Sequence, residues 1–506
     1  MLPPLPAGVK PTQPAPFAGH HATLWEARVT PPTLNNTLMR HRSMLLMPAA
    51  LTALLLHGGI CSAQPAPDSV FAITGAALWD GTGSAAQPDA VVIVRDGRIA
   101  CTGTVASCPI PAGAARIDAR GRFLLPGLID THVHLLFRVD GVTDTSIKGD
   151  LHALLARGVT AVRDMGNNPK QLLLAAAAAQ PAPRVFAMQL VAGLHFFQPE
   201  LEIDQYGNRR NHSPAAMGMR QLGWWPLTFL PNSNPADIVR QAREAGAIGL
   251  KLYQDLDSAQ TAALVMAAHA AGMPVWGHGW VQPASVLEQA QAGQDGVVHA
   301  AGLAGELVSK AARGKLRTSS SLLRVTADSA TPFSAQHPAV IAALDSLAAH
   351  GTYLEPTLSA SLLSATRATC RKRRIPSLPD RYARAASRFG MEVTRAAAAR
   401  GVRLTAGTDH TAYGPEPERA QLNDELALFV DSIGLSPARA LLAATRDAAT
   451  AIGPVAHDIG TVVVGKRADL VLFTADPLAN IGNLRGVEWV MLGGKLYRPE
   501  ALPQRP

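Results

Sequence analysis

The chain has 506 residues, of which 47% are hydrophobic, and a formal net charge of +8. This length suits one large barrel-type domain with a smaller partner, or two to three ordinary domains. Residues 1–63 hold four of the basic residues and one acidic residue, which leaves 42 basic and 37 acidic residues in the rest. This modest excess, with a single basic cluster at 371–374 that lacks interleaved aromatics, argues against a nucleic-acid partner.

The first 63 residues differ in kind from the rest. Residues 1–38 are Pro-rich and patternless, which predicts a disordered upstream extension. Residues 39–63 combine a basic start at Met39, an apolar run over 44–56 and small residues at Cys61 and Ala63. This pattern predicts a signal peptide cleaved after Ala63, and hence a bacterial periplasmic or secreted protein. The apolar run is shorter than the roughly 20 residues that a spanning helix needs, so no stable membrane anchor is expected.

Two flanking segments have the pattern of a small antiparallel sheet. Short β-type runs separated by turn residues fill 68–126 and return over 455–506. We expect the two segments to form one composite β-sandwich domain. Three cysteines follow residue 63, Cys101, Cys108 and Cys370, and their spacing excludes a Cys-x-x-Cys metal site. Pairing of Cys101 with Cys108 is left open.

Residues 127–454 alternate apolar strand candidates with alanine-rich helical stretches. The predicted strands are the segment that includes 127–137, then 158–166, 183–191, 247–253, 273–279, 295–300, 352–358 and 402–410. Eight β-then-α units predict an α/β fold, a (β/α)8 TIM-like barrel that carries insertions. The largest insertions are expected between His299 and Thr405.

Polar residues gather at the carboxyl ends of these predicted strands, which is where such barrels build active sites. His132 and His134 are two residues apart in a strand, so their imidazoles share one face. Taken singly, each residue has an ordinary explanation, as a core histidine, a surface lysine or a helix N-cap. Taken together, these ordinary explanations would require five strands to place a possible ligand at the same rim by coincidence. A shared metal site is therefore the better interpretation. The candidate metal ligands are His132, His134, Lys251, His278, His299 and Asp409.

The chain resembles the amidohydrolase superfamily, and within it the imidazolonepropionase-like and prolidase-like metal-dependent hydrolases. The matching motifs are LLPGLIDTHVHL, GVTAVRDMG, GLKLY, VWGHG, GVVHAAG and LTAGTDH. The resemblance implies two divalent metal ions, expected to be zinc. It assigns His132, His134 and Asp409 to the more buried ion and His278 and His299 to the second. It also implies that Lys251 is carboxylated and bridges the two ions.

The expected reaction is hydrolysis of a C–N amide bond by a metal-bridging hydroxide, with Asp409 as the catalytic acid-base group. The expected substrate is a small molecule with a free carboxylate: a dipeptide, an N-acyl amino acid or a cyclic amide. Candidate substrate-binding residues are Tyr253, His195 and His410, with Trp276 and Trp280 also placed at the rim.

Three alternatives stay open at this point. A lactonase or esterase would use the same metal pair. A mononuclear deaminase would lack the lysine of GLKLY. A scaffold that has lost catalysis would lack ligands. Homo-oligomerisation is also left open.

Overall fold

The computed structural model describes residues 70–136, 144–196, 202–203, 209–210, 227–314, 334–366, 380–411 and 421–502. The predicted extension over 1–38 and the predicted signal peptide over 39–63 lie outside these residues. Among the helices of the described segments, none combines the length and the apolar character that a membrane crossing requires.

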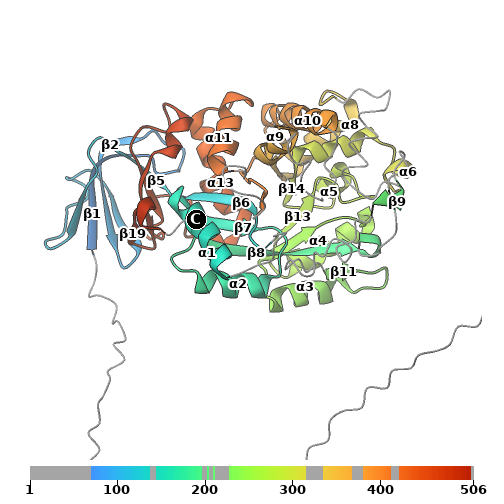
Figure 1. Ribbon diagram of the computed structural model, residues 1–506, viewed down its shortest axis with the longest axis horizontal. Coiled ribbons are helices and arrows are strands. Elements are labelled where there is room, and N and C mark those ends of the chain that lie inside the picture. Colours follow the sequence, from blue (N-terminus) through green and yellow to red (C-terminus); the bar gives the residue numbers. More distant parts are fainter. Residues whose placement is uncertain are drawn as a thin grey trace, which may run out of the picture. The chain divides into compact units, whose positions relative to one another are not determined.

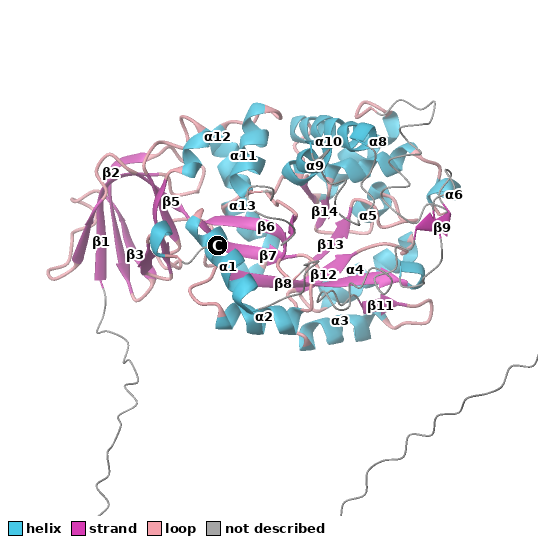
Figure 2. Ribbon diagram, viewed as in Figure 1, coloured by secondary structure: helices cyan, strands magenta, loops and turns pink. Residues whose placement is uncertain are grey.

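The larger part of the fold is a nine-stranded curled sheet in which all neighbouring strands are parallel (Figures 1 and 2). Its order is β15-β14-β13-β12-β8-β7-β6-β16, with β11 paired to β8. Parallel strands covered on both faces are apolar along their whole length, and β7 is buried at every residue. The strands are β6 (Leu128–His134), β7 (Val159–Asp164), β8 (Arg184–Gly193), β11 (Leu227–Phe229), β12 (Gly249–Leu252), β13 (Val275–His278), β14 (Gly296–Val298), β15 (Tyr353–Glu355) and β16 (His410–Thr411).

Helices alternate with these strands along the chain and pack around the sheet (Figure 2). Side-chain caps define several of their starts: Asp257 with Gln260, and Ser285 with Glu288, form capping boxes on α4 and α5. The α-helices are α1 (Asp144–Ala156), α2 (Pro169–Ala178), α3 (Pro235–Glu244), α4 (Ser258–Ala270), α5 (Val286–Gln291), α6 (Lys310–Arg313), α8 (Pro338–His350), α9 (Leu358–Thr366), α10 (Asp380–Ala399), α11 (Leu422–Asp431), α12 (Pro437–Ala443) and α13 (Arg446–Ile452). Short 3-10 helices are η1 (Leu194–Phe196), η2 (Ala300–Leu307), η4 (Pro454–Ala456), η5 (Ile481–Arg485) and η6 (Pro499–Ala501).

The segment predicted as the eighth strand is irregular but joins both ends of the curled sheet. On one side, the Leu354 N–H of β15 donates to the Arg403 carbonyl at 2.9 Å. On the other side, the Thr131 N–H of β6 donates to the Ala406 carbonyl at 3.1 Å. Within 402–411, only β16 is a regular strand, and it pairs with β6. The segment that carries Asp409 is therefore anchored directly to the strand that carries the two histidines.

The flanking segments form one eight-stranded composite sheet, as far as the described residues extend. Strand β5 from the N-terminal segment pairs antiparallel with β17 from the C-terminal segment, from Leu470 opposite Pro126 to Phe473 opposite Phe123. The predicted union of 68–126 with 455–506 is thus present as a single sheet, while the division into two facing sheets stays a prediction. Its strands are β1 (Val70–Leu78), β2 (Gln87–Arg95), β3 (Arg98–Gly103), β4 (Ala115–Asp118), β5 (Phe123–Pro126), β17 (Leu470–Phe473), β18 (Val487–Leu492) and β19 (Lys495–Tyr497).

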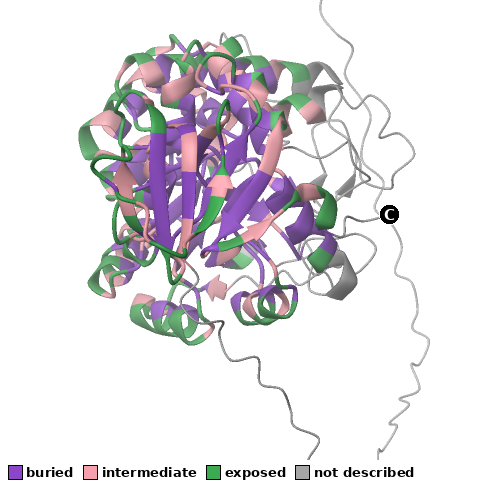
Figure 3. Ribbon diagram, turned by 90° about the vertical axis from the view of Figure 1, so that its left-hand side faces the viewer, coloured by how far each residue is buried: buried purple, intermediate pink, exposed green. Residues whose placement is uncertain are grey.

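Burial follows this arrangement, with buried residues running along the strands and exposed residues on loops and outer helix faces (Figure 3).

A disulfide joins Cys101 of β3 to Cys108, whose Cα atoms are 5.9 Å apart. Two further short strands, β9 (Glu202–Ile203) and β10 (Arg209–Arg210), pair antiparallel. Most of the segment around them, 197–226, lies outside the described residues.

Gly127 is the point at which the chain passes from the composite sheet into β6. Its N–H donates to the Asp469 carbonyl at 2.8 Å, which ties the junction to the C-terminal segment. A Cβ atom at this position would lie 2.0 Å from Thr160 Oγ1, so no side chain fits. The glycine of the PGLIDTHVH motif therefore allows close packing of β6 on β7 and helps to set the position of the two histidines.

Candidate metal centre

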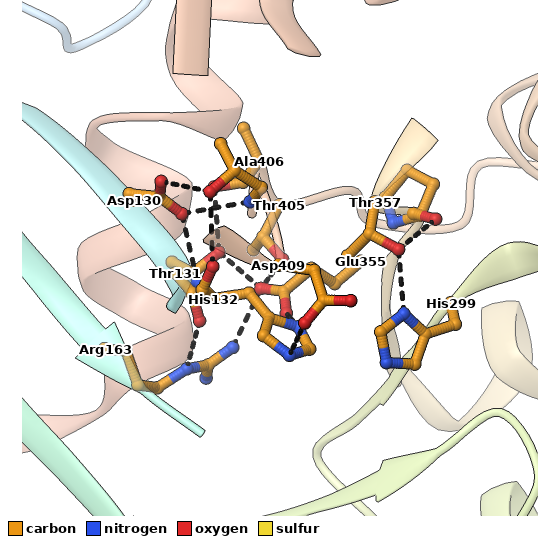
Figure 4. Close-up of polar contacts among 12 residues, drawn as sticks. Asp130, Thr131, His132, Arg163, His299, Glu355, Thr357, Thr405, Ala406 and Asp409 are labelled. Atoms are coloured by element: carbon orange, nitrogen blue, oxygen red, sulfur yellow. Dashed lines mark hydrogen bonds and ion pairs between the residues drawn. The ribbon is translucent and has the colours of Figure 1, made fainter. Parts of the chain in front are cut away.

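The parallel strands deliver the predicted ligands to one end of the curled sheet. His134 is the last residue of β6 and His278 the last of β13, while His299 directly follows β14. Lys251 lies in β12, and Asp409 directly precedes β16. In Figure 4, His132, His299 and Asp409 lie close together.

Three of these residues form a triangle of the size that one metal ion needs. His132 Nε2 lies 3.3 Å from His134 Nε2 and 3.4 Å from Asp409 Oδ1. His134 Nε2 lies 3.2 Å from the same oxygen. Corners of a tetrahedron around an ion bound at about 2.0–2.1 Å are about 3.3–3.4 Å apart. The three atoms can therefore share one ion without rearrangement.

The second group of predicted ligands adjoins this triangle. The His299 ring centroid lies 5.0 Å from that of His132 and 4.6 Å from that of His278. Potential ligand atoms of His132, His299 and Asp409 all lie within 4.8 Å of one another. His299 and His278 thus lie next to each other, and His299 adjoins the triangle.

Hydrogen bonds decide which ring nitrogen each histidine presents. A carboxylate only accepts, so the 2.8 Å bond from His132 Nδ1 to Glu355 makes Nδ1 the donor and leaves the lone pair on Nε2. The Thr357 hydroxyl donates to the Pro356 carbonyl, so it must accept from His299 Nδ1, at 2.8 Å. The Trp280 N–H instead donates to His278 Nδ1 at 3.1 Å. The unprotonated nitrogens are thus Nε2 of His132 and His299, and Nδ1 of His278, and a metal at His278 Nδ1 would have to replace the hydrogen bond from the Trp280 backbone N–H.

Burial sets the charges of the site. It lowers the pKa of His132, His278 and His299 well below the ordinary histidine value, so these rings are neutral ligands at physiological pH. Burial alone would raise the pKa of Asp409, but His132 and His134 outweigh it and hold that pKa below the usual value. An ionised Asp409 beside the neutral His132 ring is the protonation state that metal binding requires.

Lys251 is the least conventional member of the group. Its side chain is 1% exposed, and its amine has no hydrogen-bond partner among the described residues. Burial lowers the pKa of Lys251 to about 7. An unpaired buried ammonium is costly, so the neutral amine is favoured above this pH. A neutral amine is nucleophilic and open to modification.

The backbone is strained at the same end of the sheet. His299, Thr357 and Asp409 have positive φ angles of 64°, 51° and 54°. Such conformations are uncommon for residues other than glycine and cluster at functional sites. His299 and Thr357 follow β14 and β15 and are hydrogen-bonded to each other, and Asp409 precedes β16.

The residues predicted to bind substrate differ in their position relative to the metal ligands. The Tyr253 ring lies 4.7 Å from the His278 ring and 5.2 Å from that of Phe196, so it borders the centre as expected. His410 lies in β16 and is 5% exposed. The side chain of His195 lies outside the described residues. The placement of Trp276 at the rim is wrong, because this residue is fully buried and stacks on Tyr353 at 6.1 Å within the core. Trp280 is 2% exposed.

Two buried acids beside the ligands were not foreseen from the sequence. Asp130 accepts from the backbone N–H groups of His132 and Thr408, both at 3.1 Å, and so links the two ligand-bearing segments. Glu355, at the end of β15, accepts from His132 (Figure 4). An acidic residue closing an apolar strand, as in TYLEPTL, is the signal that could have identified Glu355.

Comparison with known proteins agrees with this architecture. The model of the amidohydrolase family matches residues 123–497. An imidazolonepropionase of Mycolicibacterium smegmatis is 48% identical over 52 residues, which are 10% of this chain and 13% of that protein. A deacetylase of Agrobacterium fabrum is 38% identical over 87 residues, 17% of this chain and 20% of that protein. The matched segments thus span a small part of these curated relatives.

Among solved structures, a Xaa-Pro dipeptidase with methionine bound in its active site is similar in fold. It has a TM-score of 0.60 at 20% sequence identity, and the alignment covers 85% of this chain and 100% of that one.

Proposed function

This chain belongs to the amidohydrolase family, and we propose that it is a binuclear metal-dependent hydrolase that cleaves a C–N amide bond in a small molecule. The observation that carries the proposal is the triangle of His132 Nε2, His134 Nε2 and Asp409 Oδ1, with edges of 3.2–3.4 Å. The adjoining His299 and His278 supply ligands for a second ion.

The donor set fits divalent zinc, for which imidazole and carboxylate are common ligands. His132, His134 and Asp409 would hold one ion, and His278 and His299 the other. We propose that Lys251 is carboxylated and bridges them, which would turn an unpaired buried amine into an anionic ligand. When bound, the ions supply an acidified water and polarise the scissile carbonyl.

The chain's own residues then have distinct tasks. Asp409 would accept a proton from the attacking water and deliver it to the leaving amine, as a positioned carboxylate does. Its lowered pKa keeps it in the accepting form. Tyr253, which borders His278, is placed to contact the substrate beside the metal ligands.

We further propose the finer architecture that fits this chemistry. The curled sheet, joined at its ends through residues 403–406, corresponds to a (β/α)8 barrel. The composite sheet corresponds to the accompanying β-sandwich. Active sites of such barrels lie at the carboxyl ends of the strands, where His134, His278 and His299 are found.

The proposed substrate is an amide with a free carboxylate, such as a dipeptide or an N-acyl amino acid, or a cyclic amide. The names of the similar proteins, a dipeptidase and a deacetylase among them, support amide chemistry. A lactonase or esterase remains the alternative, because the same centre would activate an ester carbonyl. The presence of Lys251 in β12 disfavours a mononuclear deaminase.

We expect the zinc-loaded enzyme to hydrolyse members of a library of dipeptides, N-acyl amino acids and cyclic amides. Release of the free amine would be measured, with chelator-treated protein as the control and zinc added back to restore activity. Rapid turnover of lactones or phosphotriesters, with no hydrolysis of any amide, would exclude amidase function but leave the metal centre standing.

We also propose that the protein is exported to a bacterial periplasm, because the pattern over residues 39–63 is that of a complete signal peptide. N-terminal sequencing of protein purified from whole cells should then give a mature start at Gln64. Recovery of an intact Met1 terminus from the cytoplasm would refute export.

A further inference from the structure

We propose that Glu355 is a positioning residue for His132: its carboxylate fixes the imidazole in the tautomer and orientation that present Nε2 to the metal triangle. Glu355 comes from a strand to which the sequence assigned no functional residue, and it does not itself belong to the triangle. This inference rests on the proposed metal centre and adds to it the group that prepares one of its ligands.

The contact between the Glu355 and His132 side chains is direct and buried. Glu355 Oε1 lies 2.8 Å from His132 Nδ1, and the two side chains are 0% and 1% exposed. Among the described residues, the hydrogen-bond acceptor at Nδ1 is Glu355, so the proton stays on Nδ1. Carboxylate partners of metal-bound histidines are known to orient the ring and raise its basicity.

A second set of contacts holds the other carboxylate oxygen. Glu355 Oε2 accepts from Arg163 Nη2 at 2.9 Å, from Thr405 Oγ1 at 3.2 Å and from the Thr131 hydroxyl. With Oε2 occupied in this way, Oε1 is directed at His132. These contacts therefore fix the rotation of the carboxyl group.

Arg163 is held just as firmly. Its side chain is 0% exposed, its Nε donates to the Thr131 carbonyl at 2.9 Å, and its Cζ lies 3.7 Å from the centre of the Trp276 ring. A buried ion pair contributes little net stability compared with apolar residues of similar volume. The pair is thus better explained by the contact of the other carboxylate oxygen, Glu355 Oε1, with His132 than by a gain in stability.

Gly407 shows that the packing around this contact has no spare room. A Cβ atom at Gly407 would lie 2.5 Å from His132 Cβ and 2.7 Å from Glu355 Cδ. Gly407 is two residues before Asp409, so the segment that carries the third ligand packs directly on the His132–Glu355 contact. The glycine of LTAGTDH is required there for space.

The test is the metal affinity of Glu355→Gln, measured by competition with a chromophoric chelator. An amide has one acceptor oxygen, and if this oxygen turns to Arg163 the NH2 group faces His132 Nδ1. This favours the His132 tautomer with its proton on Nε2. In that tautomer Nε2 has no free lone pair, so it cannot bind a metal. We expect one of the two zinc ions to bind about 10–100-fold more weakly.

The control is Asp469→Asn in the composite sheet. Asp469 is also buried and accepts from an arginine, Arg467 Nε, at 2.8 Å. The Asp469→Asn variant should lose thermal stability without a change in metal affinity. This control separates a general folding defect from loss of His132 positioning.

Glu355→Asp is a second variant, which keeps a carboxylate next to Arg163. We therefore expect it to fold even if Glu355→Gln does not. Its shorter side chain cannot reach His132 and Arg163 together, and zinc affinity should again fall. Wild-type zinc affinity in either Glu355 variant, once that variant is shown to be folded, would refute the positioning role but leave the proposed function standing. Wild-type protein without stoichiometric metal would overturn the proposed function, and this inference with it.

Discussion

Replacing Asp409 with Asn is expected to lower turnover by about 10²–10⁴-fold, the usual cost of losing a general acid-base group. The amide is nearly the same size as the carboxylate, so the fold should persist. It cannot take up a proton from the attacking water, although its oxygen can still face His132 and His134. In the wild-type protein these histidines lie 3.4 and 3.2 Å from Asp409 Oδ1.

The measurement is kcat and KM on the best amide from the substrate screen, together with metal content. Asp295→Asn is the matched control, because Asp295 lies just before β14, at the opposite end of the strand from His299. Its carboxylate accepts from the Val275 N–H at 2.7 Å and pairs with His269. Near-normal turnover of the metal-loaded Asp409 variant would remove this residue from the mechanism.

Replacing Lys251 with Met is expected to abolish binding of the metal pair and reduce activity to the level of chelator-treated enzyme. The proposed carbamate is the ligand shared by both ions, so its loss leaves two neighbouring dications without a bridging anion. Metal analysis and the intact mass of the wild-type protein would test this. An unmodified wild-type mass, together with unchanged metal content in the variant, would rule out the carboxylated lysine.

The metal-free proteins give an independent check on the same residue. Between about pH 7, the folded pKa, and the ordinary value of 10.5, the unfolded chain holds a proton on Lys251 that the folded chain lacks. Stability of the wild-type protein therefore rises with pH across this window. In carbon dioxide-free buffer, metal-free Lys251→Met should be more stable than wild type at pH 7, and the difference should shrink toward pH 10. An increasing difference would contradict the buried neutral amine.

Part of the site could be predicted because parallel strands impose a simple rule on the sequence. Residues at the carboxyl ends of parallel strands must meet at one edge, however far apart they are along the chain. The sequence therefore identified His132, His134 and His278 as neighbours from their positions in strand-like segments alone. Alternation of side chains along β6 likewise predicted that the two histidines share a face.

Depth within the sheet could not be predicted in this way. Trp276 precedes His278 by two residues and shares its face, yet it lies in the core under Arg163 and not at the rim. Which level of the interior each inward residue reaches depends on the stagger of neighbouring strands, and this stagger is set by the pairing of all strands in the sheet.

The sequence by itself determined the α/β alternation, the pairing of the N- and C-terminal segments in one sheet and the candidate ligands at the strand ends, because these depend on periodic patterns and strand ends. Only the tertiary structure decided the hydrogen-bond partners that select ring nitrogens. Glu355 and His132 are 223 residues apart, and no local pattern links them. Their contact exists because β15 and β6 lie on either side of the irregular segment 403–406, and because Gly407 leaves space for both side chains. Such packing is a property of the tertiary structure as a whole, in which each side chain's position depends on all its neighbours.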